Sequence, residues 1–105
     1  MSSATAAANA SMVPSTQRPI PLERRNDLVV KRIEYKGISS YVIKDPVGLK
    51  YHRLQQEQYR TLELLDGVRS LDDIKTELQR LFPALHFTLP DVQHLITDFH
   101  NKGLV

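Results

Sequence analysis

Apolar side chains recur at short spacing early in the chain and at helical spacing later, and this change predicts strands followed by helices. The segments 28–35, 38–44 and 50–54 are short and rich in Val, Ile and Tyr, which favours extended structure. Lys36-Gly37 suits a tight turn between the first two segments, because glycine tolerates a positive φ. We therefore expect a small antiparallel sheet of three strands.

The strand pattern also predicts which side chains share a face. In the first strand, Val29, Ile33 and Tyr35 lie on one face, which Lys31 interrupts. The third strand is short and lies at the edge of the predicted sheet. Its backbone N–H and C=O groups could pair with an added peptide strand.

From residue 55 onward, leucines recur at helical spacing and predict three helices, over 55–65, 71–82 and 89–102. Ser70 and Thr88 each precede a carboxylate by three residues, which is the pattern of a capping box at a helix start. The residues expected to be buried on the last two helices are Leu71, Ile74, Leu78, Leu81, Phe82, Leu89, Val92, Ile96 and Phe99.

Composition divides the chain into a tail and one domain. Residues 1–21 are rich in Ala, Ser and Thr, hold three prolines and show no periodicity, which predicts disorder. We expect a disordered or extended N-terminal tail over 1–27. Residues 28–105 are expected to form one α+β domain, winged-helix-like, with a three-stranded antiparallel sheet followed by three α-helices.

Charge and cysteine content narrow the functional classes. The chain of 105 residues has no Cys, which excludes a disulfide scaffold, a thiolate zinc site and a cysteine nucleophile. Residues 1–60 carry ten basic and five acidic groups, whereas residues 61–105 carry four basic and seven acidic groups. The basic half could attract an anionic partner.

No residue pattern indicates catalysis. The four glycines are scattered, so no Gly-rich phosphate loop is present. His94 and His100 are six residues apart on a predicted helix and point in different directions, so they cannot share a metal ion. We expect a protein that is not an enzyme and has no metal site and no cofactor.

A sheet with three helices can also be a winged-helix nucleic-acid-binding domain. A recognition helix should carry Arg and Lys toward phosphates and base edges. Here the predicted helices around 71–82 and 89–102 are both net acidic. This weakens the attraction to phosphate, so nucleic acid is the less favoured partner.

An ordered series of short motifs resembles the PqqD-like family. The family consists of small domains that act as precursor-peptide recognition elements in the synthesis of ribosomal peptide natural products. The resemblance covers about residues 29–105. The motifs are Tyr41-Val-Ile-Lys-Asp45, Tyr51-His-Arg-Leu54, Leu62-x-x-Leu65-Asp66-Gly67, Ser70-Leu71-x-x-Ile74, Leu81-Phe82-Pro83, Asp91-Val92 and Gly103-Leu104-Val105.

The resemblance implies a non-catalytic module that captures a leader or substrate peptide by strand addition. The peptide would lie beside the third strand and against the last helix, and a peptide-modifying enzyme would be the second partner. Lys31, Arg32, Lys50 and Arg53 could attract an acidic leader. The peptide-binding residues carried over by position are Lys50, Tyr51, His52, Arg53, Leu54, Val92, Gln93, Leu95, Ile96, Phe99 and His100.

One departure from the family pattern suggests another role. The Arg-rich segment 18–36 is similar to the cytosolic N-terminal part of larger bacterial membrane proteins. In those proteins a PqqD-like domain precedes a membrane-embedded zinc peptidase or a transport module. The alternative is therefore a regulatory or substrate-recruiting domain of such a protein. Both alternatives imply a cytoplasmic location, and an open edge strand permits a monomer or a weak dimer.

Overall fold

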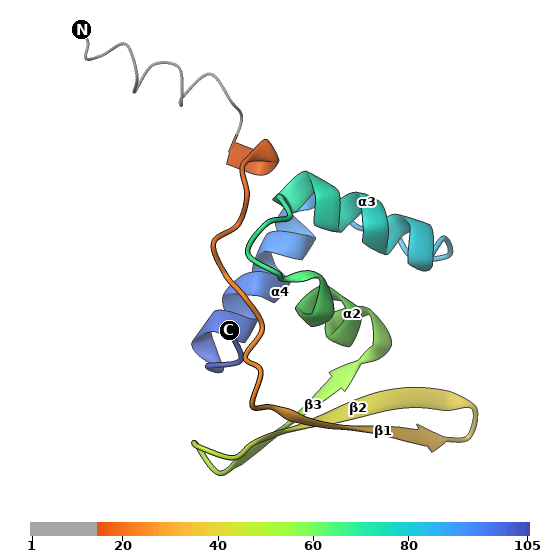
Figure 1. Ribbon diagram of the computed structural model, residues 1–105. Helices are drawn as coiled ribbons and strands as arrows, with labels where there is room; N and C mark the ends of the chain where they lie inside the picture. The colour runs from red at the N-terminus through yellow and green to blue at the C-terminus, as the bar shows by residue number, and fades with distance from the viewer. Residues whose placement is uncertain (1–14) are drawn as a thin grey trace, which may run out of the picture.

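A computed structural model describes residues 15–105 and confirms an α+β fold, with a three-stranded sheet followed by three helices (Figure 1). The part of the expected tail before residue 15 lies outside the described residues. No helix in 15–105 is long and apolar enough to cross a membrane. The elements are the 3₁₀ turn η1 (Ser15–Gln17), the strands β1 (Val29–Tyr35), β2 (Ile38–Asp45) and β3 (Lys50–Gln55), and the helices α2 (Gln56–Leu64), α3 (Leu71–Leu81) and α4 (Leu89–Asn101).

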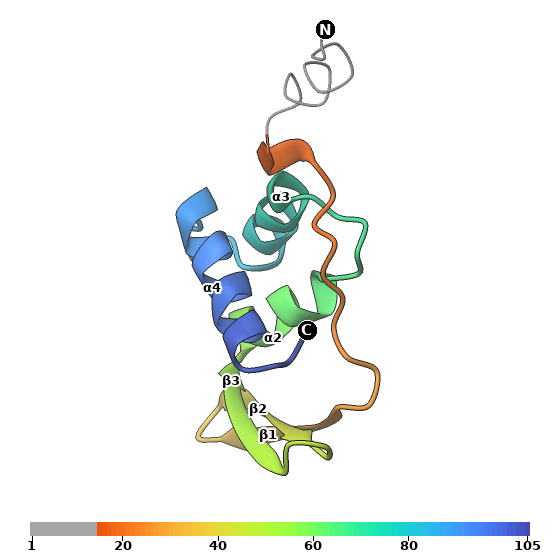
Figure 2. The same ribbon diagram turned by 90° about the vertical axis from the view of Figure 1, so that its left-hand side faces the viewer.

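The sheet is an antiparallel meander in the order β1-β2-β3, as the sequence predicts. Lys36 and Gly37 both have positive φ angles, of 51° and 79°, and join Tyr35 to Ile38 as a tight two-residue turn. A turn of this kind matches the right-handed twist of the strands. The three helices all lie on one side of the sheet (Figures 1 and 2).

The strand register gives the sheet an inner face toward the helices and an outer face away from them. On the inner face, Ile43 of β2 is fully buried and lies between Val30 of β1 and His52 of β3. The set formed by Val29, Ile33 and Tyr35 is on the outer face, so Val30 contributes to the core in its place. The alternation of side chains along a strand shows which residues share a face, but the packing of the helices decides which of the two faces is buried.

One hydrophobic core joins the inner face to the helices. The rings of Tyr41 and Tyr59 stack with their centroids 4.0 Å apart and link the sheet to α2. Phe99 of α4 is fully buried near the middle of this core. The other buried apolar residues are Leu28, Ile43, Leu54, Leu62, Leu65, Ile74, Leu78, Phe87, Val92, Ile96 and Leu104.

Both predicted capping boxes are confirmed. The Asp73 N–H donates to the Ser70 hydroxyl and the Ser70 N–H donates to the Asp73 carboxylate, and Thr88 and Asp91 repeat this exchange. Four burial predictions differ from the structure, since Leu71 and Phe82 are only half-buried against the core. Leu81 is exposed at the end of α3, where the chain leaves the core. Leu89 is half-buried, because it stands in the first turn of α4 at the rim of the core.

The segment 18–27 is extended and pairs with distant backbone, and this differs from the disorder expected up to residue 21. The Ile20 N–H donates to the Arg69 carbonyl at 3.0 Å, and the Gly67 N–H donates to the Leu22 carbonyl at 3.1 Å. We call residues 18–27 the N-terminal strap. Its composition hides this role, because backbone hydrogen bonds to the α2–α3 connection need no particular side chain.

The core position of Phe99 leads to a stability prediction. Phe99→Ala should lower the free energy of unfolding by about 3–5 kcal/mol, because it removes a buried ring and leaves a cavity. Asn101→Ala, at an exposed position two residues on, should change it by less than about 0.5 kcal/mol. Urea titration followed by circular dichroism measures both. Equal effects for the two variants would contradict the core assignment.

Candidate functional site

The strand β3 is an edge strand of the sheet. It pairs with β2 through the register Ser40↔Gln55 to Asp45↔Lys50. Its other edge has no strand partner in the part of the chain that the structure describes. In Figure 2, β3 is the strand nearest to α4. An extended segment could therefore add to this open edge of β3.

The predicted contact residues of β3 divide between the two faces of the sheet. His52 and Leu54 share the inner face with Ile43, whereas Tyr51 and Arg53 are on the outer face. Leu54 is 1% exposed and belongs to the core, so only its backbone could contact a peptide. His52 is half-buried, and its Nε2 is buried without a hydrogen-bond partner. Lys50, at the start of the strand, is exposed.

The predicted contact residues of α4 also divide. Val92, Ile96 and Phe99 are buried in the core, so their side chains do not offer a surface to a peptide. Gln93 lines a hollow with the strap and α3, on the side away from β3. Leu95 lines a different hollow, of about 380 Å³, with Glu57 and the α3–α4 connection. His100 is exposed near the end of the helix.

The predicted basic patch is split by the strand alternation. Lys31 and Arg53 face outward on either side of Val42. Arg32 faces inward and donates to the Ser39 hydroxyl at 3.0 Å and the Glu34 carboxylate at 3.4 Å. Four basic residues that look like one patch in the sequence therefore lie on two faces.

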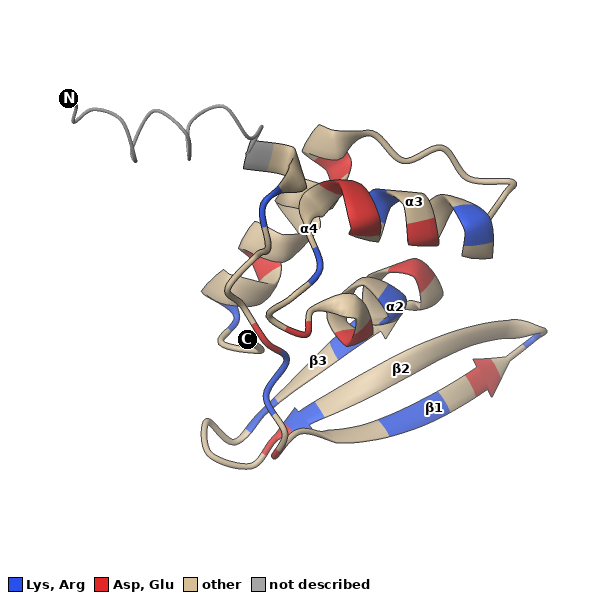
Figure 3. Cartoon of the chain, turned by 45° about the horizontal axis from the view of Figure 1, so that its top comes forward, with Lys and Arg blue, Asp and Glu red and all other residues tan. Residues whose placement is uncertain are grey.

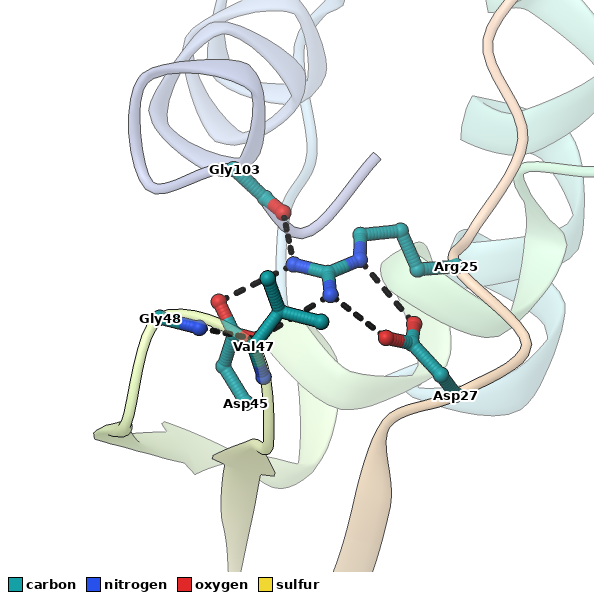
Figure 4. Close-up of polar contacts among 6 residues, drawn as sticks. All are labelled: Arg25, Asp27, Asp45, Val47, Gly48 and Gly103. Carbon is teal, nitrogen blue, oxygen red and sulfur yellow. Dashed lines mark hydrogen bonds and ion pairs between the residues drawn. The ribbon is translucent and has the colours of Figure 1, made fainter.

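The end of β2, where the loop to β3 begins, is held by Arg25 of the strap (Figure 4). The Arg25 guanidinium donates to both carboxylate oxygens of Asp45, at 2.9 and 3.0 Å, and to the Gly103 carbonyl at 3.0 Å. It also donates to both oxygens of Asp27. Arg25 thus joins the strap, the end of β2 and the C-terminal segment, and sequence reasoning did not identify it, because its partners are far apart in the chain.

Asp45 shapes the loop between β2 and β3. Its Oδ1 accepts hydrogen bonds from the N–H groups of Val47 and Gly48, both at 3.0 Å. A Cβ at Gly48 would lie 2.8 Å from Asp45 Oδ2, so the turn needs glycine there. Arg25 is the largest influence that lowers the pKa of Asp45, from 3.8 to about 2, and the Gly48 and Val47 N–H groups add to it.

Charge is distributed unevenly between the sheet and the helices (Figure 3). Residues 29–55, which form the sheet, carry six basic and two acidic groups. Residues 56–105, which form the helical side, carry five basic and eight acidic groups. The division found in the sequence therefore becomes a division between two layers of the molecule.

A further hollow lies near the turn between β1 and β2. It has a volume of about 450 Å³ and contains the exposed side chains of Tyr35 and Ile38, together with Arg53, Gln55 and Gln58. Sequence reasoning did not identify this surface. The available signal was the placement of Tyr35 and Ile38 on either side of a two-residue turn.

Comparisons with known proteins give no assignment for this site. No family model matches the chain, and no curated protein or solved structure is significantly similar to it. Among residues 15–105, no group of three or more His, Asp and Glu side chains could hold a metal ion.

The Arg25–Asp45 pair predicts a dependence of stability on acid. The pKa of Asp45 is lower in the folded chain than in the unfolded chain, so the unfolded chain binds the proton first as the pH falls. The stabilisation is present above pH 3.8 and is lost as the pH falls toward about 2. Thermal unfolding of the wild type should shift to lower temperature through this window, and Asp45→Asn should reduce the shift.

Asp72→Asn is the matched control for this measurement. This variant also removes one carboxylate but keeps the Arg25–Asp45 pair, so it should retain the loss of stability that the pair causes in this window. If Asp45→Asn retains the full wild-type loss between these pH values, Asp45 is not the responsible group.

Proposed function

We propose that this domain is a non-catalytic peptide-binding module that captures a leader or substrate peptide by strand addition to β3. The open edge of β3 next to α4 is the observation that carries the proposal. An added strand obtains its affinity from main-chain hydrogen bonds and its specificity from alternate side chains. The motif resemblance to the PqqD-like family supports the same mode of binding.

The side chains around the edge define what the peptide would meet. Peptide residues on the inner face would lie beside Lys50 and His52. Peptide residues on the outer face would lie beside Tyr51 and Arg53. Both rows offer a cation, which favours a peptide with acidic residues.

The helices support a peptide over duplex DNA as the partner. The range of α3 holds three acidic and two basic residues, and the range of α4 holds two acidic residues and neither Lys nor Arg. A helix of this charge would be repelled by the phosphates of a major groove. Two cations of the sheet, Lys50 and Arg53, lie instead in β3, at the edge where the peptide is proposed to add.

The proposal can be tested by hydrogen exchange. The probes are synthetic peptides that cover the short open reading frames flanking the gene. Amides of β3 that exchange rapidly in the free protein should become protected when a peptide binds, because they gain main-chain partners. The amides of β1, the other edge strand, provide the internal control and should not change. Protection confined to β1 or to the N-terminal strap would contradict the proposal.

A pair of α4 variants tests Leu95 as a wall of the site, because its hollow is also lined by Glu57, which follows the last residue of β3 by two positions. Leu95→Ser should weaken binding of a peptide identified in this way by about tenfold, the loss expected when one leucine contact is removed. Gln93→Ala should leave the affinity unchanged, because Gln93 lines the hollow on the other side of α4. Isothermal titration calorimetry measures both affinities, and thermal unfolding checks that both variants are folded. Equal losses for the two variants would exclude this wall.

A further inference from the structure

The outer face of the sheet has an unusual composition for a surface that meets only water. Antiparallel sheets with one open face normally place polar residues on it. Here apolar residues and cations alternate, and no carboxylate is present. The outward residues, in register across the strands, are Tyr35 and Ile38, then Ile33, Ser40 and Gln55, then Lys31, Val42 and Arg53, then Val29, Lys44 and Tyr51.

Most of the exposed apolar surface of the described chain gathers here. Of the nine large apolar side chains that are exposed, six lie on this face or in the β2–β3 loop. Patches of this kind on a small domain mark an interaction site. The six are Val29, Tyr35, Ile38, Val47, Leu49 and Tyr51.

The cations of this face have no acidic neighbour on it. None of Lys31, Lys44 and Arg53 takes part in an ion pair within residues 15–105. Lys44 Nζ lies 5.9 Å from the centre of the Tyr51 ring, and Arg53 donates to the Ser40 hydroxyl at 3.4 Å. No carboxylate of the described residues neutralises these three charges, so they are available to an anionic partner at this face.

The β2–β3 loop follows directly on the row of Val29, Lys44 and Tyr51 and carries two exposed aliphatic side chains. Val47 is 77% exposed and Leu49 is 79% exposed. Leu49 has a φ of 55°, a left-handed conformation that costs free energy for a leucine. The loop is held in this shape by Asp45, which Arg25 fixes in turn. These hydrogen bonds therefore hold the loop that carries Val47 and Leu49 in one conformation.

We infer that the outer sheet face and the β2–β3 loop bind the surface of an anionic lipid membrane. Val47 and Leu49 would enter the interface, the tyrosines would lie at the headgroup level, and the three cations would meet anionic headgroups. The acidic groups of the helices lie on the other side of the sheet, so the charge of the domain favours this orientation (Figure 3). A second copy of the same face would bring like charges together.

This surface overlaps the proposed peptide site only at the side chains of Tyr51 and Arg53. The peptide would pair with the backbone edge of β3 next to α4, whereas the lipid would contact side chains that point away from the helices. A domain bound to lipid in this way could still offer its β3 edge, and failure of either proposal would leave the other standing.

The test is sedimentation with vesicles of equimolar phosphatidylcholine and phosphatidylglycerol, compared with vesicles of phosphatidylcholine alone. The protein should bind the anionic vesicles and not the neutral ones. Each cation near an anionic surface contributes about a fivefold change in partition. Lys31→Glu/Lys44→Glu should therefore reduce binding by more than about tenfold. Val47→Ser/Leu49→Ser should also reduce it severalfold, because it removes the inserted side chains.

Lys75→Glu/Arg80→Glu on α3 is the matched control, since it makes the same change in net charge on the helical side. It should bind as well as the wild type, and circular dichroism should show that all variants are folded. Absence of binding to anionic vesicles, or an equal loss in the control, would overturn the inference. The inference would also be overturned if the protein were a dimer in lipid-free solution and Val47→Ser/Leu49→Ser made it a monomer. A second copy of the chain would then cover the face.

Discussion

The contacts of Arg25 hold the layers of this small domain together. One guanidinium binds the carboxylate that ends β2, a second carboxylate in the strap and a carbonyl after α4. A guanidinium suits this task because its planar set of donors can meet several oxygens at once. The geometry of the β2–β3 loop and the start of β3 follow from the position of Asp45. Both proposed surfaces border this cluster, so its loss would affect more than stability.

The sheet has two surfaces with different potential uses. Its β3 edge offers backbone groups beside α4, and its outer face offers cations among apolar side chains. The first favours an extended peptide and the second a broad anionic surface. The helices carry most of the acidic residues and cover one side of the sheet, so the opposite face of the sheet is basic. The side of the sheet that the helices leave open is therefore also the side that attracts anions.

The sequence predicted where the candidate site lies, but it did not predict which residues offer side chains to a partner. The edge strand over 50–54 followed from the strand count and from the short third segment. The burial of Leu54, Val92, Ile96 and Phe99 did not, because the same periodicity describes a core stripe and a groove wall. Gln93 and Leu95 are two positions apart and line different hollows on opposite sides of α4. The spacing of the motifs does not show which of the two sides faces a partner.

The sequence by itself determined the local elements of this protein. The capping boxes at Ser70 and Thr88, the turn at Lys36-Gly37 and the order of strands and helices depend on residues near one another in the chain. Only the tertiary structure decided which sheet face is buried and where the strap docks. Those outcomes depend on contacts between distant segments, such as Arg25 with Asp45 and Ile20 with Arg69, which no local pattern encodes.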